Sequence, residues 1–406
     1  MRPAASWRWI AVGVFVFSSV LNYLDRQILA AVAPLLLAEF HLTKTDYGLL
    51  LSGFSIAYAV SSPFSGYILD RFGLNRGIGI AVAFWSVATS AMGFARNFAG
   101  LFLCRAALGI GQSGAVPAFG KLNGMYLEPK ERAFGAALQQ TGLSIGGMLA
   151  PPFAVWIALR YSWRAAFIAA GIAGLLWIPI WLGTARRIPP EFETGAPQIP
   201  IGGMLRDRRL QALVLGNVLW MGTYTLWSNW TTLYLVQVHH QTVLQASWYA
   251  WIPPLMANAG AFLGGWLSLH SIQRGLAPSQ ARIRAILISA VGSLLTAAIP
   301  LAPNAGWATA GISLSYFWAA SGSVNVYTLP LDLYGAERAG FAISALVFAY
   351  GILQTFFSPV IGYLVDHQGY GPVCLLVAGM PMLAYAVMAR GAGTTFYAKN
   401  LDSRVT

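Results

Sequence analysis

Long apolar runs recur from one end of the sequence to the other, and they restrict the possible folds more than any other feature. Twelve such runs can be counted, and each reaches the roughly 20 residues that a helix needs to cross a bilayer. Only 9% of the residues are charged, against roughly 25% in soluble domains. Because backbone groups in lipid must pair within helices or closed barrels, we predict an all-α polytopic membrane protein with twelve transmembrane helices.

The most polar connector divides the chain into two parts. It runs from 185 to 209 and contains four prolines and five arginines. We therefore predict a six-helix bundle over 1–185, a cytoplasmic linker over 186–209, a second six-helix bundle over 210–390 and a cytoplasmic tail over 391–406. Most of the 25 Lys and Arg residues then fall in loops on the side of both termini, which the topology rule assigns to the cytoplasm.

The charge and the remaining composition exclude several functions. A net charge of +12 can indicate nucleic-acid binding, but loop positions between apolar runs account for it, so no nucleic acid is expected. Cys104 and Cys374 lie in apolar runs without metal-ligand spacing, and no cofactor is expected. The first apolar run is too long for a cleaved signal and carries Asp25 and Arg26. These features predict a multi-pass protein of an inner or plasma membrane, and we expect a monomer in the lipid bilayer.

Two internal repeats support a transporter architecture. Glu131-Arg132-Ala133 recurs as Glu337-Arg338-Ala339, about half a chain later. Residues 62–73 match residues 358–369 at Ser, Pro, Gly, Tyr, Asp and the last Gly. The predicted topology places these longer segments on opposite sides of the membrane. Parallel six-helix repeats with inverted three-helix repeats inside them give this relation, and they are typical of transporters.

The first apolar run carries two adjacent charges near its middle. Asn22, Asp25 and Arg26 have spacings of three and four residues, which places them roughly on one helix face. Charges at membrane depth are costly, so they face a protein interior or a water-filled cavity. We predict that this face lines a translocation path.

The fourth apolar run contains Arg105 and a literal Gly-x-Gly-x-x-Gly that begins at Gly109. A dinucleotide site is not expected, because no strand precedes these glycines. They instead favour close helix packing. An arginine inside an apolar run needs an anion or acceptor, which Asp25, backbone carbonyls or substrate can supply. Alternatively, Arg105 extends to the outer interface.

Further polar residues are candidates for a cavity or a latch. Gly66, Asp70 and Arg71 end the second run in the pattern Gly-x-x-x-Asp-Arg-x-Gly, which is typical of a conformational latch; at the matching place in the second half the acid is replaced by Leu269. Four intramembrane residues either line a cavity or bond neighbouring helices: Tyr58, Gln140, Asn325 and Tyr327. No metal cluster, nucleophile elbow or phosphate loop is present, so an enzyme is not expected.

Taken together, these motifs resemble the anion:cation symporter branch of the major facilitator superfamily. The resemblance covers the whole first half and is looser in the second. The residues that carry it are Asn22-Tyr23-Leu24-Asp25-Arg26, Gly66-x-x-x-Asp70-Arg71, Arg105-x-x-x-Gly109-Ile110-Gly111, Pro117-Ala118, Glu131-Arg132-Ala133, Ser162-Trp163-Arg164, Trp230-x-x-x-Tyr234-Leu235 and Pro330-x-Asp332-Leu333-Tyr334. Within that branch the sequence is similar to bacterial galactonate and hexuronate symporters, which are related to animal vesicular glutamate and lysosomal sialic acid transporters.

The resemblance implies proton-coupled symport of an organic carboxylate anion, most often a sugar acid, by alternating access. It makes Asp25 the proton site, Arg26 and Arg105 the anion ligands, and Tyr23 and Tyr58 pocket residues. Gln140, Asn325 and Tyr327 complete the expected substrate site. The hypothesis that follows is that deprotonated Asp25 holds Arg26 or Arg105, and that protonation frees the arginine for a substrate carboxylate.

One position departs from the family pattern. Many members have a Glu seven positions after the arginine of the fourth run, where this chain has Gln112. Gln112 lies on the face of Arg105 and stays among the expected substrate-binding residues, although it cannot titrate. Either this protein couples fewer protons, or a natural Glu was changed to trap one state. The alternative function is an uncoupled facilitator or an anion exchanger for a small carboxylate.

Overall fold

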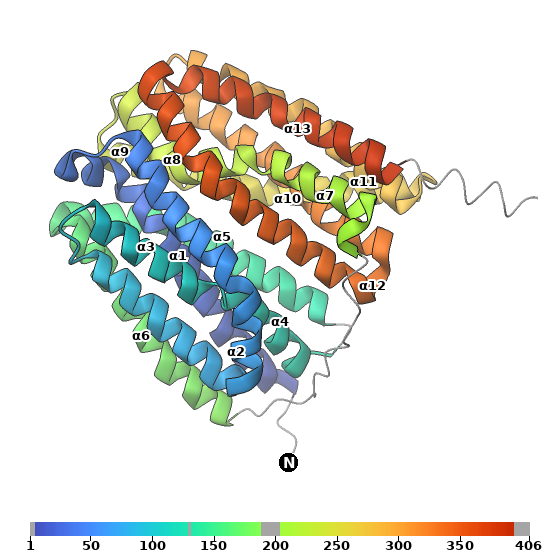
Figure 1. Cartoon of the computed structure of the whole chain (residues 1–406), viewed down its shortest axis with the longest axis horizontal. Helices are drawn as coiled ribbons and strands as arrows, with labels where there is room; N and C mark the ends of the chain where they lie inside the picture. Colours follow the sequence, from blue (N-terminus) through green and yellow to red (C-terminus); the bar gives the residue numbers. More distant parts are fainter. Residues whose placement is uncertain (1–4, 129–130, 188–203, 394–406) are drawn as a thin grey trace, which may run out of the picture. The chain divides into compact units, whose positions relative to one another are not determined.

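The computed structural model describes residues 5–128, 131–187 and 204–393, and these form helices without any strand (Figure 1). The elements are α1 (Ala5–Phe40), α2 (Lys44–Met92), α3 (Phe98–Gln112), α4 (Ala115–Tyr126), α5 (Arg132–Arg160), α6 (Trp163–Arg187), η1 (Met204–Arg206), α7 (Arg208–Trp220), α8 (Gly222–Val238), α9 (Val243–Ala250), α10 (Ile252–Gln273), α11 (Pro278–Ser293), η2 (Leu294–Leu301), α12 (Ala305–Gln368) and α13 (Tyr370–Gly393). The all-α prediction is confirmed for these residues. Most of the expected linker and tail lies outside them.

The chain contacts define two compact units. Unit 1 comprises 1–196, 232–251 and 354–363, and unit 2 comprises 197–231, 252–353 and 364–406. In unit 1, α1 packs on α5 and α6, while α2 packs on α3 and α6 (Figure 1). In unit 2, α13 packs on α7 and α11, and α10 packs on α11. The domain limits expected from the sequence stay a prediction.

Polar residues define several helix starts. Thr43 forms a capping box with Asp46 at the start of α2, and Thr242 forms one with Gln245 at the start of α9. The Asn304 side chain accepts from the Trp307 N–H at the start of α12. Each arrangement satisfies backbone donors that have no partner within the first turn of a helix.

Glycines with positive φ allow the sharp bends in α2 and α12. Gly73 has φ of 75° and Gly335 has φ of 70°, a region that strongly favours glycine. Gly369, at the end of α12, also has φ of 75°. Gly73 and Gly369 are the last matching residues of the longer repeat, so the two copies share this backbone feature as well as their sequence.

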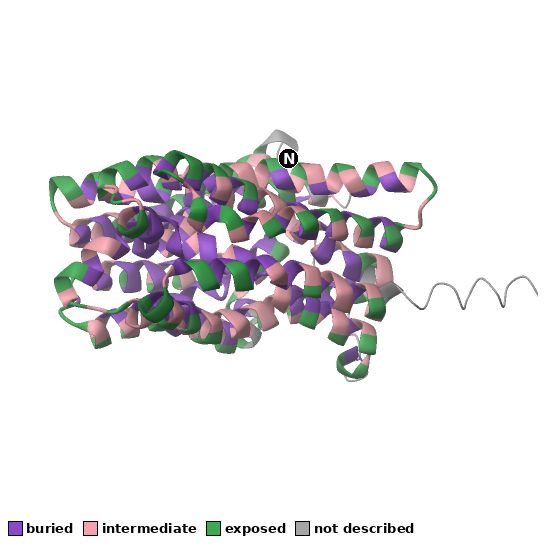
Figure 2. Cartoon of the chain, turned by 90° about the horizontal axis from the view of Figure 1, so that it is seen from above, coloured by how far each residue is buried: buried purple, intermediate pink, exposed green. Residues whose placement is uncertain are grey.

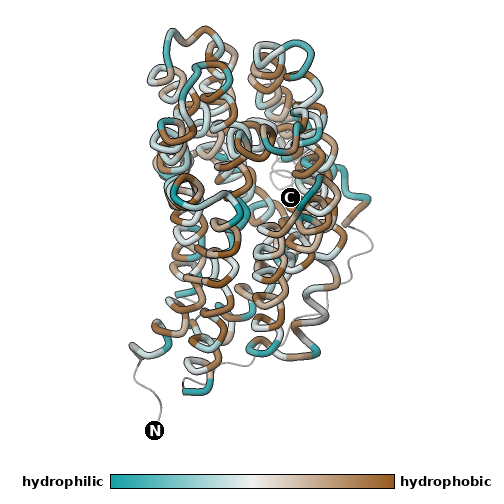
Figure 3. The backbone as a smooth tube through the Cα atoms, turned by 90° about the vertical axis from the view of Figure 1, so that its left-hand side faces the viewer, coloured by the Kyte–Doolittle hydropathy of each residue, from teal (hydrophilic) through white to brown (hydrophobic). Residues whose placement is uncertain are grey.

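Seven segments of the described residues are long and apolar enough to cross a membrane. In Figure 3, apolar and intermediate colours dominate the helices, while hydrophilic residues gather chiefly at the turns. The composition thus agrees with a membrane-embedded protein. The expected twelve spans and the side of each terminus stay predictions.

Buried aromatic residues form the centre of each unit. In unit 1, the rings of Trp177 and Trp181 stack with centroids 5.7 Å apart, and Phe15 packs edge-on against both. In unit 2, the Trp220 indole N–H donates to the Ala319 carbonyl at 2.9 Å. Buried and exposed positions alternate along single helices (Figure 2). Each helix therefore has one packed face.

Candidate functional site

A close approach of α2 and α3 brings the first site residues together. Gly109 lies one turn after Arg105, and a Cβ added to it would lie 2.4 Å from the Phe54 carbonyl oxygen. Any larger residue would push the two helices apart. The glycine of the fourth run thus has the packing role expected from the sequence, and it places Phe54 of α2 beside Arg105 of α3.

Arg105 is fully enclosed, with only 1% of its surface exposed. Its Nη1 donates to the Arg26 carbonyl oxygen at 3.4 Å, and its guanidinium carbon lies 4.9 Å from the centre of the Phe54 ring. The buried Nε has no hydrogen-bond partner. Of the alternatives left open by the sequence, the structure shows a backbone carbonyl beside Arg105 and an inward rather than an interfacial position.

Arg26 is partly exposed and faces α3. Its Nε and Nη2 donate to the Gln112 Oε1 at 3.3 and 3.2 Å. The Gln112 Nε2 in turn donates to the Asn22 carbonyl oxygen at 2.9 Å, so both ends of this amide are bonded. A glutamate could not make that last donation when charged, because an ionised carboxylate only accepts.

Three aromatic rings surround the Arg26 guanidinium. Its central carbon lies 5.5 Å from the Tyr23 ring centre, 5.4 Å from Tyr58 and 4.7 Å from Phe54. Cation–π contacts of this length stabilise an arginine by about 0.5–2 kcal/mol. The structure therefore brings Arg26, Tyr23, Tyr58 and Gln112 together, as the sequence predicts, and adds Phe54, which the sequence analysis missed.

Asp25 points elsewhere. It is 1% exposed, and neither of its carboxylate oxygens has a hydrogen-bond partner. Thr89 of α2 approaches it, but the Thr89 hydroxyl donates to the Trp85 carbonyl at 2.9 Å. Among the described residues, no ion pair joins Asp25 to Arg26 or Arg105.

The expected Asp25–arginine pair is therefore absent from the structure. The physical reason is helix geometry: consecutive residues lie about 100° apart around a helix axis. Asp25 and Arg26 consequently face different neighbours, and the single face expected from their spacing is only approximate. Arg26 pairs with the amide of Gln112 instead.

The remaining predicted site residues are more scattered. Asn325 is buried in unit 2 and donates to the Gly264 carbonyl of α10 at 3.0 Å, which bonds two neighbouring helices, and to the Ser321 carbonyl of its own helix α12 at 3.1 Å. Tyr327 packs against the unit 2 core, and Gln140 is exposed on α5. The latch residues are divided. Arg71 is exposed, whereas Gly66 and the side chain of Asp70 belong to the positions whose surroundings the structure does not describe.

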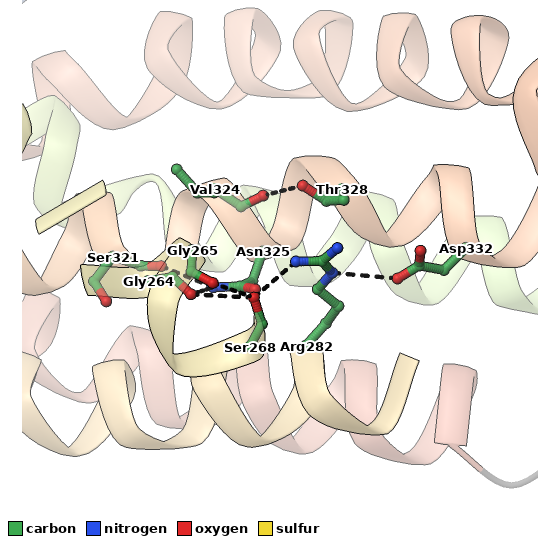
Figure 4. Close-up of polar contacts among 9 residues, drawn as sticks. All are labelled: Gly264, Gly265, Ser268, Arg282, Ser321, Val324, Asn325, Thr328 and Asp332. Carbon is green, nitrogen blue, oxygen red and sulfur yellow. Dashed lines mark hydrogen bonds and ion pairs between the residues drawn. The ribbon is translucent and has the colours of Figure 1, made fainter. Parts of the chain in front are cut away.

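Unit 2 contains an arginine in a different setting (Figure 4). The Arg282 Nε lies 3.3 Å from Asp332 Oδ2, and its Nη1 donates to the Ser268 hydroxyl at 2.7 Å. The Arg282 and Asp332 side chains are 19% and 15% exposed. This pair joins α11 to α12, and the serine adds α10. The sequence analysis did not single out Arg282 among the arginines.

Long apolar helices in two packed units, with arginines placed against aromatic rings, indicate a helical membrane protein with an internal site for an anion. The chain belongs to the Major Facilitator Superfamily, whose sequence profile matches residues 15–357. This confirms the superfamily predicted from the motifs. Members of this family are transporters rather than enzymes, in agreement with the sequence.

Individual relatives extend this result. The chain is 27% identical over 408 residues to a hexuronate transporter of Escherichia coli strain K12, covering 96% of this chain and 94% of that protein. It is 25% identical to a D-galactonate transporter of Escherichia coli O6:H1, covering 93% of each. A crystal structure of a bacterial homologue of the human lysosomal transporter Spinster, inward-facing and unoccupied, has a TM-score of 0.71 at 20% identity and 94% coverage of both chains. That last similarity shows the fold alone.

Proposed function

We propose that this protein moves a sugar-acid anion, a hexuronate or hexonate, together with a proton by alternating access. The observation that carries the proposal is Arg105, a fully buried guanidinium with no carboxylate beside it among the described residues. A buried charge needs a compensating partner, and a substrate carboxylate can provide it. The similarity to hexuronate and galactonate transporters supports the choice of substrate class.

Arg26 and Arg105 are the anion-binding residues in this proposal. An arginine presents two parallel N–H donors that match the two oxygens of a carboxylate. Arg26 is partly exposed, so it meets the substrate first. Tyr23, Tyr58 and Gln112 surround Arg26 and offer hydroxyl and amide groups to the hydroxyls of a sugar acid.

Asp25 carries the coupled proton. Its buried carboxylate has no hydrogen-bond partner, so the charged form is costly at this position. A proton taken up on one side of the membrane and released on the other makes the carboxyl neutral during part of the cycle. We propose no cofactor besides the proton.

The proposed setting is the bacterial inner membrane. The chain crosses it twelve times as a monomer, with both termini in the cytoplasm, and two six-helix halves move about the central site. The apolar helices support the membrane location, and the bacterial relatives support a bacterial membrane. Gly66, Asp70 and Arg71 would then act as a latch on the cytoplasmic side.

Uptake into proteoliposomes tests the proton coupling. The protein should concentrate radiolabelled galactonate or galacturonate when the pH inside is higher than outside, and Asp25→Asn should abolish accumulation while counterflow exchange continues. Asp46→Asn, at a partly exposed position at the start of α2, is the matched control and should accumulate substrate normally. Accumulation by Asp25→Asn would contradict the assignment of Asp25.

An uncoupled facilitator or exchanger is the second candidate. The observation that favours it is Gln112, whose amide is bonded at both ends and cannot carry a proton. A facilitator would equilibrate the same substrate without concentrating it, whatever the pH gradient. The proteoliposome assay therefore separates the two candidates in the unmodified protein.

A further inference from the structure

Two positive charges lie on one aromatic ring in unit 1. The guanidinium carbons of Arg26 and Arg105 lie 4.7 and 4.9 Å from the centre of the Phe54 ring. The two charges are consequently within about 10 Å of each other, which is no more than the screening length at 0.1 M salt. Phe54 is only 4% exposed and Arg105 only 1%, so little water lies on the Arg105 side of this pair to weaken the repulsion.

No described acid neutralises this pair. Four acids of unit 1 are engaged elsewhere: Glu39 with Arg164, Glu128 and Glu131 with Arg8, and Asp46 in the capping box of α2. Asp25 forms no ion pair with a described residue. The direct partners of the two guanidiniums are a neutral amide, a backbone carbonyl and aromatic rings.

Neutral partners leave the cluster incomplete. An amide or carbonyl bond satisfies a donor but leaves the net charge in place, and a buried charge is stabilised chiefly by an opposite charge that is also hydrogen-bonded. The unpartnered Arg105 Nε shows that donor capacity is left over. A single carboxylate would neutralise one guanidinium and leave the other uncompensated.

We propose that this site takes organic acids with two acid groups, such as a hexaric acid, in preference to those with one. The inference rests on the proposed function and concerns the same site. Phe54 is a positioning residue here: its ring holds both guanidiniums at similar distances, and each acid group replaces a ring contact with a charge-assisted hydrogen bond. Arg26, the more exposed of the two, receives the first acid group, and the fully buried Arg105 receives the second.

Glucarate and gluconate test this directly. They share six carbons and the same four inner hydroxyls, and they differ in whether C6 is a carboxylate or a hydroxymethyl group. Isothermal titration of the purified full chain at pH 7 should show glucarate binding at least tenfold tighter than gluconate. Arg26→Gln and Arg105→Gln should each reduce that ratio to threefold or less, whereas Arg160→Gln, an exposed arginine at the end of α5, should preserve it.

The outcomes separate the inference from the proposed function. Gluconate binding as tightly as glucarate to the unmodified protein would overturn the inference and leave sugar-acid transport standing. If glucarate, gluconate, galacturonate and galactonate all failed to bind, the proposed function would be overturned, and the inference with it. A tenfold ratio that persists in folded Arg26→Gln and Arg105→Gln would also overturn the inference. Arg26→Lys keeps the charge and should keep the ratio above threefold, which guards against misfolding of the glutamine variants.

Discussion

Arg105 of unit 1 and Arg282 of unit 2 are both arginines on helices of a membrane protein, but their partners differ. Arg282 has a carboxylate at 3.3 Å and a serine hydroxyl at 2.7 Å. Arg105 has a carbonyl at 3.4 Å, an aromatic ring and a free Nε. The more deeply buried of the two arginines is therefore the less well compensated.

This difference separates a structural role from a binding role. The Arg282 charge is neutralised within the fold, so its contacts hold α10, α11 and α12 together. The Arg105 charge has no acidic partner among the described residues of the fold, so it is available to an anionic ligand. A buried ion pair adds little net stability but is costly to break, whereas an uncompensated buried charge is costly in itself and is retained where it has a function.

The largest expected effect follows from removing the uncompensated charge. Arg105→Gln should weaken sugar-acid binding by about 100-fold, because a charge-assisted hydrogen bond contributes about 1.5–3 kcal/mol. Proteoliposome uptake should fall to background. Titration calorimetry on the purified variant measures the first effect, and radiolabelled uptake measures the second.

Arg282→Gln is the matched control in unit 2. It should bind sugar acids within about threefold of the unmodified protein while unfolding at a lower temperature, since Asp332 loses its partner. A loss of binding equal to that of Arg105→Gln, at an unchanged unfolding temperature, would place Arg282 in the substrate site and remove the distinction between the two arginines.

Adding a carboxylate beside Arg26 is the opposite of removing the Arg105 charge. Gln112→Glu would give Arg26 a carboxylate partner and make its setting resemble that of Arg282. Binding of anionic substrates should weaken about tenfold at pH 8, because the new carboxylate competes for the guanidinium. It should recover as the pH falls, because protonation removes that competition; binding titrations at pH 5 to 8 measure both.

Gln273→Glu, at the exposed end of α10, introduces the same charge outside the site and should leave binding unchanged across that range. If Gln112→Glu instead bound substrate equally well at pH 5 and pH 8, Arg26 would not be an anion ligand. The assignment of Arg105 would survive that result.

The sequence predicts much of this architecture because its strongest signals are local. Apolar runs define helices, and the glycines at 73 and 369 can be matched through the repeat because glycine is strongly favoured at positive φ. Gln112 and Arg105 are seven residues apart, or about two helical turns, so a shared face follows directly. A guanidinium and an amide on the same helix face then indicate an anion site, and no tertiary information is needed for this prediction.

Phe54, Asp25 and Arg282 show where sequence reasoning fails. Phe54 is one of 22 phenylalanines in a largely apolar chain, and nothing local distinguishes a ring that contacts two guanidiniums from a ring that contacts lipid. The neighbour that Asp25 faces depends on how α1 rotates against α2, which tertiary packing decides. Arg282 and Asp332 are 50 residues apart, so their pairing depends on which helices become adjacent.

The smallest expected effect concerns the compensated arginine. Asp332→Asn should lower the free energy of unfolding by about 1 kcal/mol, because the pair is partly exposed and the amide still accepts a hydrogen bond. In a chain of this size that corresponds to a fall of about 2 °C in apparent Tm, measurable by intrinsic fluorescence in detergent. Binding should stay within twofold.

The double variant Asp332→Asn with Arg282→Gln should lose less free energy of unfolding than the two single variants together, because each single change leaves the other charge unpaired. Strict additivity would mean that Arg282 and Asp332 do not stabilise each other, and Arg282 would then be as uncompensated as Arg105.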